Sequence, residues 1–189
     1  KPLYRLTIQT EYDDINTGKK KTSNVRVEIV GIEQIQQYCK TNIIDPDKCR
    51  FTQKTSHNIT INDKLTINKI DDHDFHFRVN YKNEKILNKN HPLVKNILDN
   101  WNDTKKTFRF IKRFTYKEYS LFPFKYDCSI VKTSKKHNKS YYLIPEYNIQ
   151  EADVFNNPET YEIEMEFDNN IVDRNNIGIN QLEYLNRMM

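Results

Sequence analysis

Apolar and polar residues alternate along several stretches of this chain, the spacing that places successive side chains on opposite faces of a β-strand. The first stretch runs from Tyr4 to Tyr12, with Leu6 and Ile8 on its apolar side. A second begins at Val25, after the polar connection 14–23. We expect these two strands to pair as a hairpin.

The same pattern continues through the rest of the chain. Two short runs, 59–61 and 65–67, flank a polar turn and predict another hairpin. Further strands are predicted at 75–82, 108–116, 124–132 and 161–167, with a short one at 141–144. This number of strands favours a mainly β (α+β) fold, in which a closed antiparallel β-barrel or tunnel surrounds a polar, charged lumen.

Two segments change from strand spacing to helix spacing. Ile32, Ile35 and Cys39 recur at intervals of three and four residues, which predicts a short amphipathic helix. Pro92 suits the first turn of a helix, and an apolar stripe follows it as far as Trp101. We expect both helices to flank the sheet.

Length and composition limit what kind of protein this is. With 189 residues, the chain is expected to form a single domain, 1–189, around one buried core. A net charge of only +4 argues against a protein that coats nucleic acid, so any anion site must be local. No apolar run reaches the roughly 20 residues that span a bilayer. The three cysteines form no Cys-x-x-Cys pair, and we expect an intracellular protein with no membrane partner.

The predicted strand 161–167 carries three glutamates on one face: Glu162, Glu164 and Glu166. Their Cα atoms would lie about 6 to 7 Å apart, so the carboxylates repel one another unless cations lie against them. A hard divalent ion bound through oxygen ligands is a natural counter-charge. Taken alone, the pattern equally fits a solvated strand face that is simply acidic.

Basic side chains lie on the polar faces of other predicted strands. They are Arg26, Arg78, Arg109, Arg113 and Lys125, the last of which shares its face with Asp127 and Ser129. Strict alternation places Lys132 on the face opposite Lys125, unless a bulge or strand end turns it back. If the sheet closes with its polar faces inward, these groups and the glutamates line one cavity, as metal-assisted phosphoryl transfer requires.

Markers of other enzyme classes are missing from the sequence. The five histidines show no metal-ligand spacing such as His-x-x-x-His, and no Gly-rich loop could hold a phosphate. No lysine stands in a Lys-x-Asp-Gly motif of nucleotidyl transfer. We therefore set covalent catalysis aside.

The motifs in the second half of the chain resemble those of the triphosphate tunnel metalloenzymes, most closely the RNA triphosphatase domains of capping enzymes from large cytoplasmic DNA viruses. Glu162, Glu164 and Glu166 match the C-terminal Glu-x-Glu-x-Glu strand of that family, and Arg113 falls in its basic strand. The segment 125–129 resembles its Arg-x-Asp-x-Thr/Ser strand. The resemblance covers most of the chain.

The resemblance implies hydrolysis of an RNA 5′-triphosphate end to a diphosphate, the first step of mRNA capping, with Mn²⁺ or Mg²⁺ as cofactor and water as nucleophile. It implies that Glu166 binds the metal directly, and that Glu162 and Glu164 hold its waters or orient the attacking one. Asp127 would orient a basic neighbour as part of the catalytic set. The phosphate-binding residues would be Arg26, Arg78, Arg109, Arg113, Lys125 and Lys132. The expected location is the host cytoplasm or the virion.

One departure from the family pattern stands out. The family has a second Glu-x-Glu strand near its N-terminus, whereas residues 162–166 hold the only such motif in this chain. We expect that strand to lie upstream of Lys1, in a larger capping enzyme whose other domains or subunits would be partners; loss of the strand and of activity is the alternative. A hydrolase of free nucleoside triphosphates or tripolyphosphate, and a non-catalytic domain that binds RNA ends or a capping subunit, also remain open.

Overall fold

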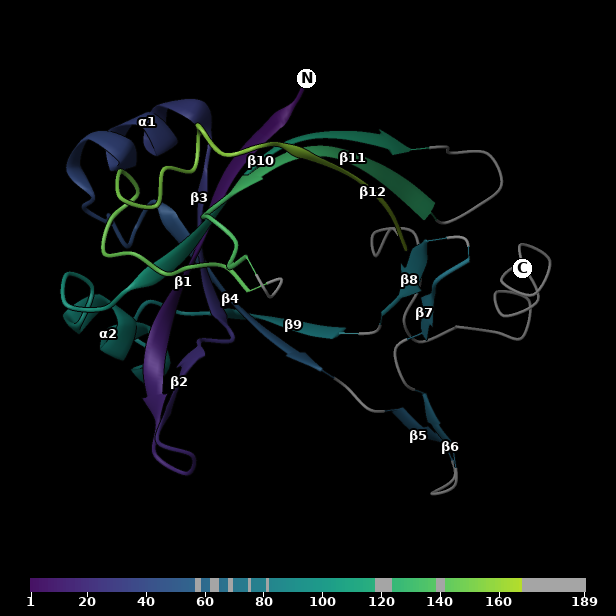
Figure 1. Ribbon diagram of the computed structural model, residues 1–189, viewed down its shortest axis with the longest axis horizontal. Helices are drawn as coiled ribbons and strands as arrows, with labels where there is room; N and C mark the ends of the chain where they lie inside the picture. The colour runs from purple at the N-terminus through teal and green to yellow at the C-terminus, as the bar shows by residue number, and fades with distance from the viewer. Residues whose placement is uncertain are drawn as a thin grey trace.

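The fold is built around one large antiparallel sheet with two helices on one side (Figure 1). The computed structural model describes residues 1–56, 59–61, 65–67, 70–74, 76–80, 82–117, 124–138 and 142–167. Seven strands follow one another across the sheet in the order β12-β11-β10-β1-β3-β4-β9, and β2 pairs with the far end of β1. Two small hairpins, β5-β6 and β7-β8, lie outside it.

The strands of the large sheet are β1 (Leu3–Asp14), β2 (Lys19–Thr22), β3 (Val25–Val30), β4 (Cys49–Ser56), β9 (Lys82–Leu87), β10 (Lys106–Lys117), β11 (Phe124–Thr133) and β12 (Thr160–Phe167). The small hairpins are formed by β5 (Ile59–Ile61) with β6 (Leu65–Ile67), and by β7 (Ile70–Asp72) with β8 (Phe77–Val79). The helices are α1 (Ile32–Thr41) and α2 (Pro92–Asp99). No described helix is long and apolar enough to cross a membrane.

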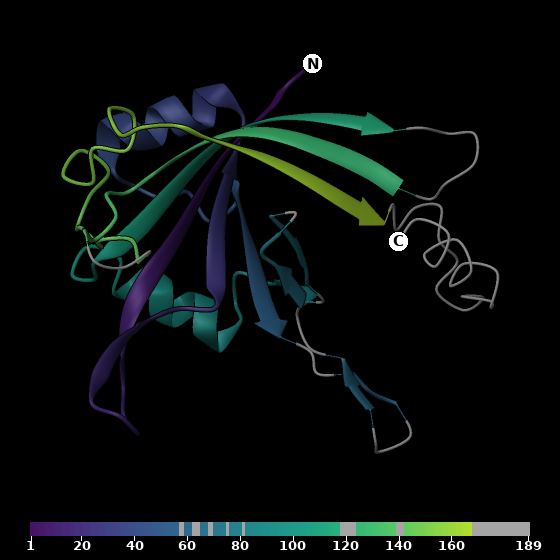
Figure 2. The ribbon, with the colours of Figure 1, turned by 45° about the vertical axis from the view of Figure 1, so that its right-hand side comes forward.

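The large sheet is strongly curved but open. β10, β11 and β12 arch over β4 and β9 (Figures 1 and 2), yet in the described part of the chain β12 pairs only with β11, and β9 only with β4. The prediction of a closed barrel is therefore wrong for this structure, which is a half-barrel. Its concave face points away from the two helices.

Alternation decides which side chains reach the core. The apolar positions of β1 and β3, among them Leu6, Ile8 and Val27, pack under the helices. α1 contributes Ile35 and Tyr38, and α2 contributes Val94, Ile97 and the following Trp101; the segment 146–157 adds Ile149, Ala152 and Val154. Because this core takes one face of the sheet, the polar positions of the same strands all lie on the concave face.

Local chain signals fix the ends of both helices. α1 begins after Gly31, whose φ of 96° is a conformation that suits glycine, and ends at Asn42 in the left-handed region. α2 begins after His91, whose side chain accepts a hydrogen bond from the backbone N–H of Leu93, with Pro92 in the first turn. Both predicted helices are confirmed.

Most predicted strands are confirmed, including the hairpins β1-β3 and β5-β6 and the three strands β10 to β12. β4 and β9 were not predicted, and the connection 14–23 is not wholly irregular, because β2 extends β1 as a ribbon. Within the predicted strand 75–82 the structure has β8 at Phe77–Val79, and Lys82 already belongs to β9, while Phe75 and Tyr81 lie outside the described residues. At 141–144 there is a single bridge, Lys136 to Leu143.

Candidate active site

Charged side chains form rows across the concave face of β10, β11 and β12. The antiparallel register places Glu166 beside Lys125, Glu164 beside Asp127, and Glu162 beside Ser129. On the next strand, Asp127 is beside Thr115 and Ser129 is beside Arg113. Three adjacent strands therefore present acids and bases together on one surface.

Arg113 is the centre of this network. Its guanidinium donates to Oγ of Ser129 at 2.9 Å, to Oδ2 of Asp127 at 2.9 Å, and to the carboxylate of Glu164. The side chains of Arg113 and Asp127 are almost fully buried, with 12% and 2% of their surface exposed. Oδ1 of Asp127 accepts a further bond from Thr115 Oγ1 at 2.5 Å. A planar guanidinium held by three partners is fixed in position.

The two outer glutamates of β12 have basic partners of their own. Arg109 pairs with Glu162, and Nζ of Lys125 lies 2.9 Å from the carboxylate of Glu166. Each of the three glutamates is thus paired with one base, two from β10 and one from β11. The row predicted from the sequence therefore exists, and its repulsion is offset by ion pairs.

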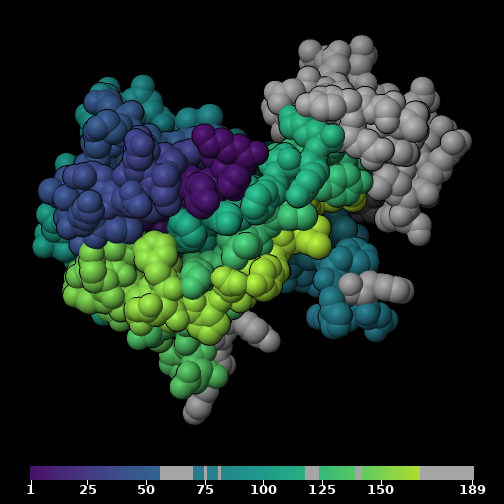
Figure 3. Space-filling view, turned by 90° about the horizontal axis from the view of Figure 1, so that it is seen from above, coloured from purple at the N-terminus to yellow at the C-terminus, as the bar shows by residue number. Residues whose placement is uncertain are grey.

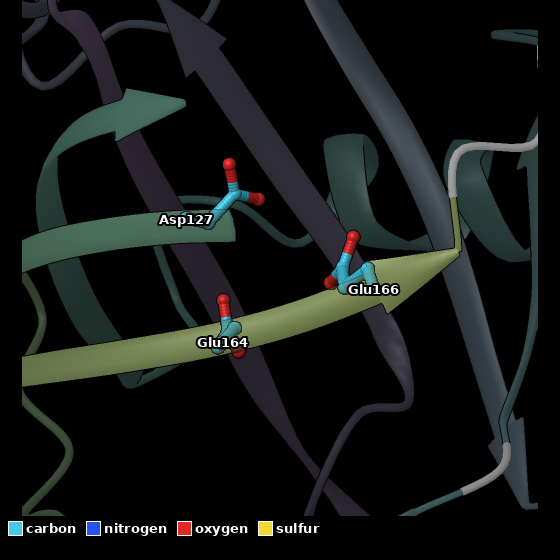
Figure 4. Close-up of side chains that lie close together, drawn as sticks. All are labelled: Asp127, Glu164 and Glu166. Carbon is cyan, nitrogen blue, oxygen red and sulfur yellow. The ribbon is translucent and has the colours of Figure 1, made fainter. Parts of the chain in front are cut away.

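Asp127, Glu164 and Glu166 could hold a metal ion (Figure 4). One carboxylate oxygen from each lies within 4.8 Å of the others, and the three side chains rise from the same side of β11 and β12. An all-oxygen set of acidic ligands fits a hard divalent cation such as Mg²⁺ or Mn²⁺. Glu162 lies outside this group among the described residues, and Asp127, expected only to orient a base, lies inside it.

The middle of the concave face carries an excess of arginine. Burial lowers the pKa of Arg26, and the positive charges of Arg109 and Arg5 act in the same direction, although the carboxylates of Glu84 and Glu28 oppose them. Burial is the main cause, and the two carboxylates offset more than the two arginines add. A bound phosphate group would supply further negative charge and so offset part of the cost of burying this guanidinium.

Glu28 on β3 is the buried carboxylate of this middle region. It lies 3.5 Å from Arg5 and 3.8 Å from Arg50, and it accepts a hydrogen bond from Oγ1 of Thr52 at 3.2 Å. Only 6% of the residue is exposed. Sequence analysis did not select Glu28 as a site residue. The signal was the alternation of Glu28 and Arg26 with valine and isoleucine along one strand.

The far edge of the concave face is formed by β4 and β9. Lys54 donates to the carboxylate of Glu84 at 2.6 Å. Burial acts to raise the pKa of Glu84, but the hydrogen bond from Lys54 and the charges of Lys54, Arg26 and Arg5 hold it below the usual value. Burial lowers the pKa of Lys82, and Lys54, Arg26 and Arg78 add to the effect. Positive charge therefore continues to this edge.

Arg78 lies on β8, outside the large sheet, where it forms an ion pair with Asp71. Its charge acts on Lys82, so it stands near the β9 edge rather than among the glutamates. Of the predicted phosphate-binding residues, Arg26, Arg109, Arg113 and Lys125 share the concave face of the large sheet.

Lys132 does not join that face, although the family resemblance implied that it binds phosphate; it lies on the opposite side, where strict alternation places it. It pairs in register with Phe110, on the core side of the sheet, and its Nζ donates to the backbone carbonyl of Phe155 at 2.7 Å. β11 is regular as far as Thr133. Strict alternation therefore holds, and no bulge turns Lys132 back.

The comparisons with known proteins support the fold. No family model matches the chain, and no curated protein sequence matches it. A solved structure of similar fold is the triphosphatase of the capping enzyme of mimivirus, which aligns with a TM-score of 0.51 at 15% sequence identity. The alignment covers 100% of this chain and 73% of that one. At this identity the likeness extends to the architecture of the sheet and helices.

Proposed function

We propose that this chain is a metal-dependent phosphohydrolase that removes the γ-phosphate from RNA 5′-triphosphate ends and leaves 5′-diphosphate RNA, the first step of mRNA capping. The observation that carries the proposal is the network of ion-paired carboxylates and bases on the concave face of β10 to β12. The fold supports it, because the similar mimivirus protein is a capping-enzyme triphosphatase.

Asp127, Glu164 and Glu166 are the residues that would hold the divalent cation, since their oxygens already converge. A bound Mn²⁺ or Mg²⁺ would neutralise phosphate charge and orient the reacting oxygens. Arg113 and Lys125 are paired with the same carboxylates. With a cation as the counter-charge, Lys125 and the Arg113 N–H that faces Glu164 would be free to donate to phosphate oxygens, while Arg113 stays bonded to Ser129 and Asp127.

The arginine and lysine side chains of the concave face would bind the triphosphate. Arg113, Arg109 and Arg26 offer planar guanidinium forks, which donate paired hydrogen bonds to phosphate oxygens and stay charged at any working pH. Lys125 adds a point charge beside Glu166. Their positive charge would stabilise the negative charge that spreads over the γ-phosphate as its bond to the bridging oxygen breaks.

The nucleophile in this proposal is water, and Glu162, which lies outside the metal-binding group, would accept its proton. Water oxygen forms the new bond to the γ-phosphorus, the bond from the γ-phosphorus to the β–γ bridging oxygen breaks, and the RNA leaves as a diphosphate. Glu162 is suited to this role because it stays free of the metal and 32% of its side chain is exposed, so water reaches it. Asp127 is tied to Arg113 and Thr115 and would keep its position throughout.

The test is phosphate release from triphosphate-ended RNA with Mn²⁺, Mg²⁺ or EDTA, with ATP and tripolyphosphate as competing substrates. We expect release that requires metal and falls by about a hundredfold or more in Glu166→Ala. Glu33→Ala, which removes an exposed carboxylate on α1, is the matched control and should keep full activity. If the protein hydrolyses ATP or tripolyphosphate in preference to triphosphate-ended RNA, the proposed substrate is wrong and the site acts on free polyphosphates. RNA-end binding without release in any metal would make the chain a binding module.

A further inference from the structure

The convex side of β10, β11 and β12 is apolar, and no described residue covers the outer part of it. Near the base of these strands the side is covered, and the Phe110 ring packs on Phe155 with centroids 5.3 Å apart. Farther along, Tyr161, Ile163, Met165 and Tyr116 are 73%, 80%, 49% and 60% exposed. Seen from above, the three strands form a band of surface over which no described element lies (Figure 3).

The strand register arranges this surface as a grid, which we name the back face. Its three rows, each read from β10 to β12, are Lys112–Ile130–Tyr161, Phe114–Cys128–Ile163 and Tyr116–Tyr126–Met165. Lys112 is the one charged residue of the nine, and its Nζ lies 5.6 Å from the Phe114 ring. Contiguous apolar patches of this kind on a soluble domain mark interaction sites.

We propose that the back face binds the back face of a second copy of this chain, with a two-fold axis parallel to the strands. Such an axis places β11 of one copy against β11 of the other, and β12 against β10. The two sheets then pack face to face with aligned strands, about 10 Å apart, as in β-sandwiches. The concave face, and with it the proposed active site, stays open in both copies.

This arrangement makes the surface complementary to itself. Tyr161 of one copy meets Lys112 of the other, so the charged residue faces an aromatic ring rather than its own copy. In the next rows Ile163 meets Phe114, and the sulfur of Met165 meets the ring of Tyr116. Along the axis, the β11 residues Tyr126, Cys128 and Ile130 meet their own counterparts, and none of them is charged. No pair in the grid opposes like charges.

The size of the back face fits a weak to moderate dimer. The four most exposed side chains offer about 500 Å² of accessible surface per copy. A large side chain has about 150 to 250 Å² when fully exposed, and these four are 49% to 80% exposed. The five partly exposed residues extend this toward the roughly 800 Å² per partner of a standard interface. Association should therefore depend on concentration, with a dissociation constant in the micromolar range.

The first test is the molar mass of the full chain by sedimentation equilibrium over a range of concentrations. We expect a monomer–dimer equilibrium, and a dissociation constant at least about tenfold higher in Ile163→Lys, which places a charge against Phe114. Ile43→Lys is the matched control, because Ile43 is 71% exposed but lies after α1. A wild-type chain that stays monomeric, or a dimer that Ile163→Lys leaves intact, overturns the proposal and assigns the back face to a different occupant.

The second test uses Cys128, which the proposed axis brings opposite its own counterpart. A short bismaleimide should link two wild-type chains through this residue and fail in Cys128→Ser. Burial raises the pKa of Cys39, and raises that of Cys49 to about 11, so these thiols react slowly. A dimer that does not crosslink, or one that crosslinks equally in Cys128→Ser, overturns the two-fold arrangement.

Discussion

Replacing Asp127 by alanine tests whether the Arg113 network holds the outer strands together. Asp127 is 2% exposed, and its two oxygens accept hydrogen bonds from Arg113 and Thr115. Alanine removes both acceptors at once. The buried guanidinium then loses the partner that is least accessible to water.

The structure sets the size of the effect. Removing one partner of a buried ion pair costs about 3–5 kcal/mol of unfolding free energy. Arg113 keeps Ser129 and Glu164, but the carboxylate of Glu164 is half-exposed, so its pairing is partly screened by water. We therefore expect about 3 kcal/mol for Asp127→Ala, the lower end of that range. Asp127→Asn keeps an acceptor oxygen and the shape of the side chain, and should cost about 1–2 kcal/mol.

The assay is urea unfolding followed by the fluorescence of Trp101, the single tryptophan, which is buried in the core beside Tyr38 of α1. Thr115→Val is the control, because it removes only the hydrogen bond that a neutral hydroxyl donates to the same carboxylate and should cost about 1.5 kcal/mol. If Asp127→Ala costs no more than Thr115→Val, the carboxylate does not hold a buried arginine, and the description of the network is wrong.

Two further predictions concern metal binding and pH. Glu164→Gln should weaken Mn²⁺ binding, measured by calorimetry, about tenfold or more because it removes a charged ligand, whereas Glu162→Gln should change it little. Burial lowers the pKa of Lys106 from 10.5 to about 8 in the folded chain, so above pH 8 the folded state releases this proton before the unfolded state does. The unfolding free energy of the wild type should therefore rise relative to Lys106→Met between about pH 8 and 10.5, and parallel pH curves would contradict this reading.

Periodicity predicted the elements whose two faces differ strongly. β1, β10 and β11 each put apolar side chains on the core side and polar ones on the concave side, so alternation identified them. β4 and β9 gave no such signal. In β9 only Leu87 is buried and the rest of the strand is exposed, because an edge strand at the rim of a half-barrel has little core to face.

The alternation of apolar and polar residues also predicted which face of each strand carries the candidate site residues, but not which residues of neighbouring strands contact one another. It placed Arg109 and Arg113 on the face opposite the phenylalanines, and it also placed Lys132 on the core side, where the structure has it. The family resemblance alone assigned Lys132 to phosphate. The pairing of Glu164 with Arg113 depends on the register of β10, β11 and β12, which residues more than 50 positions apart determine together.

Closure of the barrel could not be predicted from a count of strands. The number of strands permits a tunnel, but closure requires that the two edge strands meet, and this depends on the curvature of the whole sheet. In the described part of the chain β12 and β9 each keep one free edge. The sequence therefore predicted correctly that charged side chains share one face of the sheet, but wrongly that the sheet closes into a barrel.

The ion pairs of β12 also affect how this edge strand moves. A strand with a neighbour on one side opens more readily than a central one. Each glutamate of β12 is held by a base, and Arg109 and Arg113 reach across β11 from the strand beyond it. β12 cannot peel away without breaking these three links as well as its backbone ladder. The exchange rate of the amide hydrogens of β12 would therefore depend on side chains two strands away. An anion that binds Arg109 and Arg113 in place of the glutamates should make these amides exchange faster.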